Sequence, residues 1–206
     1  MKKNYQMHKF KLSDKTKDYL IQVVLIVGSV LLALWLDQLM ADRMDNKKKE
    51  VAINNIITEI EKNLEEVKSV SHYHEKMGKG LSMYIDSIDF DHVEENAMTI
   101  ISPFMKYGLQ VASIQETAWD MATETESVSS FEYEMAYDMT RLYDLQQRGV
   151  LSTTSKIMDF LTDPSLFRKE EREEVVMVFT FAMRELASQE KYLEEKYQEF
   201  LEKYQG

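Results

Sequence analysis

The sequence lacks several features on which whole classes of protein depend. It has no cysteine, two prolines and six glycines among 206 residues. The absence of cysteine leaves the redox compartment open, because chains without thiols occur on both sides of a membrane. The few glycines are scattered and form no phosphate-binding loop, and no serine lies in a G-x-S-x-G motif. Nucleotide binding and serine hydrolysis therefore have no signature here.

Basic residues are also scarce. The chain has 25 Lys and Arg against 36 Asp and Glu, a net charge of −11. Residues 1–36 hold six lysines and two aspartates, so residues 37–206 carry −15. Such an acidic domain repels the phosphate backbone, and no basic patch with interleaved aromatic residues is present. We expect no nucleic-acid partner, and expect the lysine-rich N-terminus to contact anionic lipid headgroups.

One stretch, residues 19–36 (YLIQVVLIVGSVLLALWL), contains no charged side chain. A helix over this stretch rises about 27 Å, close to the roughly 30 Å hydrocarbon core of a bilayer. Tyr19 and Trp35 lie near its ends, where amphipathic rings prefer the headgroup level. Leu34, Trp35 and Leu36 occupy positions at which a cleaved signal peptide needs small residues. We predict an uncleaved transmembrane helix at 19–36, between a short basic tail at 1–18 and an acidic helical domain at 37–206.

The orientation follows from the basic residues on the two flanks. The first 18 residues hold six lysines, whereas the other flank has Arg43 and the three lysines at 47–49. Because Lys and Arg tend to stay on the cytoplasmic side, this difference favours a cytoplasmic N-terminus. The predicted location is the inner or plasma membrane, as a single-pass protein. The bulk of the chain is then extracytoplasmic, in the periplasm if the source is a Gram-negative bacterium.

The rest of the chain is predicted to be helical. Residues 14–77 contain no proline, so the membrane helix is expected to continue until a break at Gly78 and Gly80. An apolar stripe is formed by Ile53, Ile57, Ile60, Leu64 and Val67. Glu59 falls between these positions and is expected to face water.

Later helices are indicated by their start signals. Two sequences have the form of capping boxes, at residues 113–116 (SIQE) and 129–132 (SSFE), and each is expected to begin a helix. A break or cap is expected at Gly149, and Asp163-Pro164 marks a boundary. The last helix carries a long apolar stripe: Val175, Phe179, Ala182, Leu186, Leu193, Tyr197, Phe200 and Tyr204. The predicted fold is all-α, with one N-terminal transmembrane helix continuing into an antiparallel bundle of four or five helices.

Several short motifs follow one another along the chain in an order that resembles that of known proteins. They are the anchor ending in ALWLDQ, the helix with Glu59, Asn63 and His72-Tyr73-His74, the stretch Glu116-Thr117-Ala118-Trp119, and then Tyr143 and Gln146. Over roughly residues 15–150 the chain resembles an uncharacterised family of bacterial single-pass membrane proteins with an N-terminal anchor and a helical domain carrying an Ala-Trp motif. The resemblance implies fold and topology and supplies no activity.

The residues with the most chemical potential are three histidines and one tryptophan. His72 and His74 lie two positions apart, about 200° around a helix, so a helix does not present both to one metal ion. On an irregular turn they would share a face, and His92 near Asp89 and Asp91 would complete a zinc-type ligand set. Histidines that merely bond to backbone or solvent are the alternative, and we expect no metal site.

Trp119 is expected either to pack beneath the irregular segment 89–112 or to line a small pocket. No catalytic residue and no cofactor is predicted. The sequence favours a non-enzymatic interaction or assembly module, with a protein partner or a homo-oligomer. The alternative is a ligand- or metal-binding sensory domain that signals through a partner.

Overall fold

The computed structural model describes residues 14–205. The chain is 84% helical and has no β-strand within that range, which confirms the all-α prediction. The predicted tail falls largely outside the described residues, because positions 1–13 precede them. The chain divides into two compact units, Met1–Lys48 and Lys49–Gly206.

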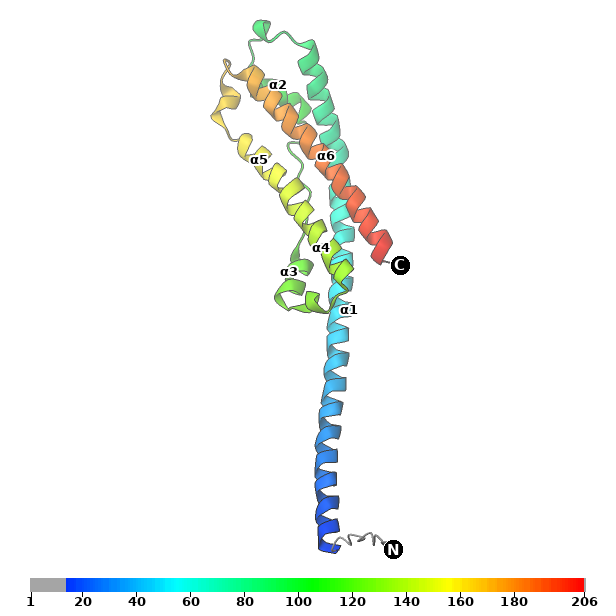
Figure 1. Cartoon of the computed structure of the whole chain (residues 1–206). Coiled ribbons are helices and arrows are strands. Elements are labelled where there is room, and N and C mark those ends of the chain that lie inside the picture. Colours follow the sequence, from blue (N-terminus) through cyan, green and yellow to red (C-terminus); the bar gives the residue numbers. More distant parts are fainter. Residues whose placement is uncertain (1–13, 206) are drawn as a thin grey trace, which may run out of the picture. The chain divides into compact units, whose positions relative to one another are not determined.

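The first helix, α1 (Asp14–Ser87), has 74 residues and contributes to both units (Figure 1). It contains no proline, so no residue lacks the backbone donor that the helical ladder needs. In the first unit, the large apolar side chains from Tyr19 to Leu36 are all exposed. By length and composition, this helix is apolar enough to cross a membrane.

The predicted break at Gly78 and Gly80 is wrong, because α1 continues to Ser87. Both glycines lie at close contacts inside the second unit. A Cβ atom at Gly78 would lie 3.3 Å from the backbone nitrogen of Arg184, and one at Gly80 would lie 3.1 Å from the ring of Phe104. Glycine within a helix costs roughly 0.5–1 kcal/mol, and these close contacts offset that cost.

After α1, the second unit contains five further α-helices, two of them short. They are α2 (Ala97–Ile101), α3 (Thr117–Glu124), α4 (Tyr133–Leu145), α5 (Ser152–Phe160) and α6 (Arg172–Tyr204). A π-helical segment, η4 (Gln146–Leu151), joins α4 to α5 without interruption, so the break predicted at Gly149 is wrong. The boundary at Asp163-Pro164 is confirmed, since Asp163 caps a short 3₁₀ turn (Pro164–Phe167). The helix α6 contacts α2, α4, η4 and α5 (Figure 1).

The core of the second unit lies between the later half of α1 and the helices that follow. The predicted stripe on α6 is confirmed, with Ala182 and Tyr204 at its partly buried edge. On α1 the predicted stripe is confirmed at Ile60 and Val67, which are fully buried, whereas Ile53, Ile57 and Leu64 are only partly buried. Ile56 is fully buried instead, so the buried face is rotated from the predicted stripe. Because of this rotation Glu59 faces the core, at 6% exposure, and the expectation that it faces water is wrong.

Neither capping box forms. The helix α3 begins at Thr117 and α4 begins at Tyr133, and their N-cap residues, Glu116 and Glu132, make no side-chain capping bond. At residues 113–116, a residue distant in sequence binds a group that the capping box would use, because the Ser113 backbone N–H donates to the Glu66 carboxylate. In the second box, the serine hydroxyls at 129 and 130 donate to backbone carbonyls within a 3₁₀ turn.

Candidate functional site

The three histidines singled out from the sequence do not come together. His72 is exposed, with its Nδ1 3.9 Å from Glu75, and His92 is exposed beside Asp89 at 2.9 Å. His74 is 1% exposed and bonds to Glu190. Within residues 14–205, no group of three or more His, Asp or Glu side chains is placed to hold a metal ion.

Trp119 packs as a partly buried residue of α3. Its ring stacks on Tyr143 of α4, with the centroids 5.1 Å apart and the planes 11° apart. It belongs to the partly buried shell around the hydrophobic core and is not among the residues that line the cavity described below. This ring contact is with α4 rather than with the segment 89–112, so both expectations for Trp119 remain predictions.

A cluster of polar side chains is buried where α1, α4, η4 and α6 meet. We call it the Glu59 cluster, and its members are Glu59, Asn63, Glu116, Tyr143, Gln146 and Tyr197. Asn63, Gln146 and Tyr197 are fully buried. Buried polar groups are costly unless they are hydrogen-bonded, so the partners of each member decide what the cluster does.

Glu59 caps the start of α3 from another helix. Its carboxylate accepts hydrogen bonds from the backbone N–H groups of Ala118 at 2.7 Å and Trp119 at 3.4 Å, and from the Tyr143 hydroxyl at 2.7 Å. The first N–H groups of a helix have no partner within the helix and carry partial positive charge, so a carboxylate there is favourable. The tertiary contact thus replaces the capping box predicted at residues 113–116.

Asn63 and Gln146 continue the cluster. The Asn63 side chain pairs with the backbone of Gln115 in both directions, donating at 2.7 Å and accepting at 2.8 Å. The Gln146 amide donates to Glu116 at 2.9 Å, and its oxygen accepts from the Tyr197 hydroxyl at 2.5 Å. Burial raises the pKa of both tyrosines, and the carboxylate of Glu59 adds to the rise at Tyr143. Both hydroxyls are therefore neutral donors.

The cluster works as a structural clamp. Each member is bonded to another member or to backbone, and these bonds join α1 to the segment before α3. Five of the residues quoted for the resemblance, Glu59, Asn63, Trp119, Tyr143 and Gln146, lie in this cluster or against it, whereas His72 and His74 have other partners. Sequence reasoning otherwise missed the cluster. One sequence signal could have revealed it. Glu59 and Asn63 are four positions apart and share a helix face with Ile56, Ile60 and Val67, so the pattern places two polar side chains on a buried face.

A second buried polar contact joins α1 to α6. His74 Nδ1 lies 2.8 and 2.9 Å from the two carboxylate oxygens of Glu190, and each side chain is 1% exposed. Burial raises the pKa of Glu190, and the hydrogen bond from His74 works against that rise. The other ring nitrogen, Nε2, is buried and has no hydrogen-bond partner among the described residues.

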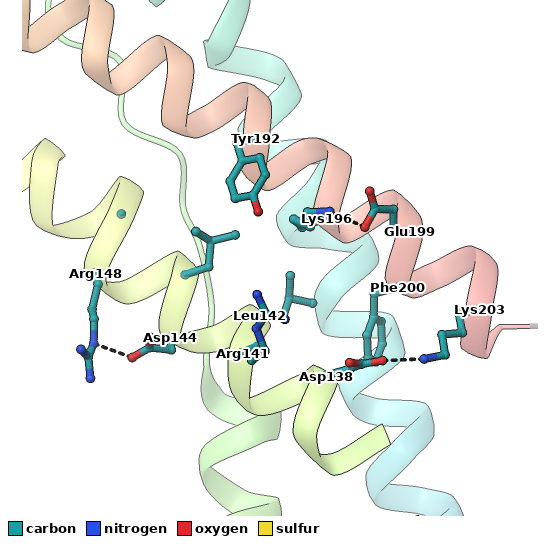
Figure 2. Close-up of a pocket in the computed structure, with 12 residues that line it drawn as sticks. Asp138, Arg141, Leu142, Asp144, Arg148, Tyr192, Lys196, Glu199, Phe200 and Lys203 are labelled. Atoms are coloured by element: carbon teal, nitrogen blue, oxygen red, sulfur yellow. Dashed lines mark hydrogen bonds and ion pairs between the residues drawn. The ribbon is translucent and has the colours of Figure 1, made fainter. Parts of the chain in front are cut away.

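The third feature is a surface cavity of about 560 Å³ between α4 with η4 on one side and α6 on the other (Figure 2). Its walls carry four cationic side chains: Arg141, Arg148, Lys196 and Lys203. Three of these form ion pairs: Arg148 with Asp144, Lys196 with Glu199, and Lys203 with both Glu134 and Asp138. Leu142 and Phe200 are buried beneath it.

No family model matches this chain, and neither the curated proteins nor the solved structures contain a significant match.

Proposed function

We propose that this chain is a membrane-anchored, non-enzymatic helical protein that presents an interaction surface to a protein partner or to a second copy of itself. The observation that carries the proposal is the exposure of every large apolar side chain from Tyr19 to Leu36. Each such side chain left in water forgoes about 1.5–3 kcal/mol relative to burial. A bilayer covers all of them at once, since the stretch matches its thickness.

The anchor is tested by alkaline extraction of membranes that contain the full chain. The unaltered chain stays with the membrane. The double variant Leu25→Arg, Leu31→Arg is extracted, because each Arg at the centre of a span costs about 2.5–3.5 kcal/mol on insertion. The control Val51→Arg introduces an arginine at an exposed apolar position outside 19–36 and stays with the membrane. Extraction of the unaltered chain would refute the anchor.

We further propose a cytoplasmic N-terminus and an extracytoplasmic second unit, on the strength of the six lysines that precede the span. The lack of cysteine makes the test direct, because a single introduced thiol is then the only one to label. Glu185→Cys reacts with a membrane-impermeant maleimide on intact cells. Ser13→Cys reacts only after permeabilisation, and the reverse pattern would invert the topology.

An antiparallel bundle of four or five helices belongs to the same proposal. Its support comes from three contacts between α1 and α6 or the residue after it. Glu61 bonds to Gln205, His74 bonds to Glu190, and Gly78 lies against Arg184. Position numbers rise along α1 as they fall along α6, which is the pattern of antiparallel neighbours.

The interaction surface is placed on the first half of α6. From Val175 to Met183 this helix is apolar on nearly every side, although only one side faces the core. Met177 and Val178 are each 49% exposed and Phe181 is 72% exposed. A helix that is apolar all round is normally buried, so an exposed side of this kind favours a partner.

A photo-crosslinking residue placed at Phe181 tests this surface in native membranes. We expect a discrete crosslinked product whose mass identifies either a partner or a second copy of the chain. The same residue at Glu195, an exposed position in the later half of α6 beyond the apolar segment, serves as the control and gives no such product. Equal crosslinking at both positions, or none at Phe181, would rule out this surface.

A further inference from the structure

The cavity between α4, η4 and α6 has the composition of a ligand site. We propose that it binds a small amphipathic anion, a carboxylate on an apolar chain, with the headgroup at Arg141 and the chain over Leu142, Leu145 and Phe200. This site goes beyond the interaction surface on α6 and does not depend on it. It gives the ligand-binding alternative a specific place in the fold.

Size and shape are the first argument. The cavity volume of about 560 Å³ falls within the roughly 300–1,000 Å³ typical of small-molecule sites. Its lining joins an apolar floor, formed by Leu142, Leu145 and Phe200, to a rim of charged side chains, so one part of the cavity suits an apolar chain and another suits a charged headgroup. Figure 2 shows Tyr192 and Arg141 facing the space between the two helices from opposite sides.

Charge is the second argument. In a chain of net charge −11, the lining of this cavity holds four cationic side chains and three carboxylates. Among the described residues, Arg141 has no ion-pair partner, and its guanidinium carbon lies 5.8 Å from the ring of Tyr137. Its neighbour Asp138 is already bonded to Lys203 and to Tyr204. Arg141 is therefore the cation left to meet an anion, and a guanidinium binds a carboxylate through two parallel hydrogen bonds.

The backbone beside the cavity is the third argument. The π-helical segment η4 forms part of the wall and includes Gly149. Single-turn π-helical segments within α-helices occur frequently at functional sites. A Cβ atom at Gly149 would meet only Leu145 Cδ1, at 4.0 Å, so the missing side chain leaves open space. The glycine thus keeps this part of the cavity wall open.

The test measures octanoate binding by calorimetry to the full chain in nanodiscs of zwitterionic lipid, with empty nanodiscs subtracted. Octanoate carries both headgroup and chain, octanol lacks the charge, and acetate lacks the chain. We expect saturable binding of octanoate, binding of octanol weaker by roughly tenfold or more, and no measurable binding of acetate. Equal affinity for octanoate and octanol, or no saturable octanoate binding, would overturn the proposal.

Two variants place the binding in this cavity. Arg141→Gln lowers octanoate affinity by roughly tenfold or more, because a hydrogen bond to a charged group is lost. Gly149→Leu fills the open space and abolishes binding. The matched control Arg168→Gln removes an exposed arginine that does not line the cavity and leaves the affinity unchanged. Equal octanoate affinities of Arg141→Gln and Arg168→Gln would overturn the assignment. This comparison remains decisive even if Gly149→Leu fails to fold.

Native mass spectrometry of the purified chain identifies the natural occupant. A bound fatty acid and a bound phospholipid differ in mass. A fatty-acid adduct that is lost in Arg141→Gln supports the site, whereas a phospholipid adduct in its place would contradict the assignment of a small carboxylate. An adduct that persists in Arg141→Gln contradicts it.

Discussion

At the scale of single residues, Glu59 has the most consequential contacts in the second unit. It is the acceptor for two backbone N–H groups at the start of α3 and for the Tyr143 hydroxyl. Truncating it leaves three donors without a partner in a nearly closed site. The cost of such unsatisfied groups exceeds the net worth of the bonds themselves.

We predict that Glu59→Ala lowers the free energy of unfolding by about 3 kcal/mol, measured by urea titration of the full chain in detergent. The control Glu65→Ala removes an exposed carboxylate from the same helix and changes stability by less than about 0.5 kcal/mol. Similar values for the two variants would show that the Glu59 bonds are not formed.

The buried pair of His74 and Glu190 gives the protein a specific dependence on pH. Because burial raises the pKa of Glu190 above its ordinary value of 4.5, the folded chain holds this proton at a pH where the unfolded chain has released it. Its contribution to stability is fully present below pH 4.5 and is lost as pH rises through the folded-state pKa.

The variant Glu190→Gln has no such proton, so the stability of the natural chain relative to it is greatest below pH 4.5 and falls as pH rises. Urea titrations of both chains across the acidic and neutral range measure this difference. Glu195→Gln, an exposed carboxylate on the same helix, is the matched control. A difference that stays constant or increases with pH would contradict the prediction.

At the scale of elements, glycine has opposite effects in two helices. Gly78 in α1 lies against Arg184 of α6, whereas Gly149 in η4 borders open space. From the sequence alone the two glycines are equivalent, because each weakens an isolated helix through the backbone conformational entropy that it loses on folding. Their neighbours decide which of them is needed for packing.

We predict that Gly78→Leu destabilises the second unit by about 1–3 kcal/mol, because its Cβ atom would lie 3.0 Å from Arg184 Cγ and the longer side chain has no room. Gly149→Ala is the matched control and stabilises the chain by roughly 0.5–1 kcal/mol, as Ala restricts the unfolded state. Thermal unfolding followed by circular dichroism measures both. A stabilising effect of Gly78→Leu would exclude the close contact with Arg184.

At the scale of the whole molecule, stability is concentrated in one unit. All the buried apolar residues of the described chain lie at or after Ile56, so the first unit contributes nothing to the hydrophobic core. A chain that begins at the start of the second unit therefore keeps every core contact.

We predict that residues 49–206 alone fold cooperatively and remain soluble without detergent, as judged by circular dichroism and a single sharp thermal transition. The same fragment carrying Glu59→Ala melts at a lower temperature, which shows that the measured transition reports the native packing. A fragment that is unfolded, or that aggregates at once, would show that the first unit is required for folding.

The sequence by itself determined the properties that depend on local pattern. The uncharged stretch at 19–36, the helical class and the apolar stripe on α6 follow from composition and periodicity, because each residue contributes independently of distant partners. The boundary at Asp163-Pro164 follows for the same reason, since proline acts on its own backbone.

Only the tertiary structure decided the polar interior and the helix ends around it. Glu59 faces the core, Gly78 continues a helix, and the capping boxes fail because residues distant in sequence supply the partners. Local pattern assigns a carboxylate to water and a glycine to a break, since those are their lowest-energy states in isolation. The Ala118 backbone N–H of α3 donates a hydrogen bond to Glu59, which lies 59 positions earlier in the sequence. This bond reverses that preference, and no local pattern encodes it.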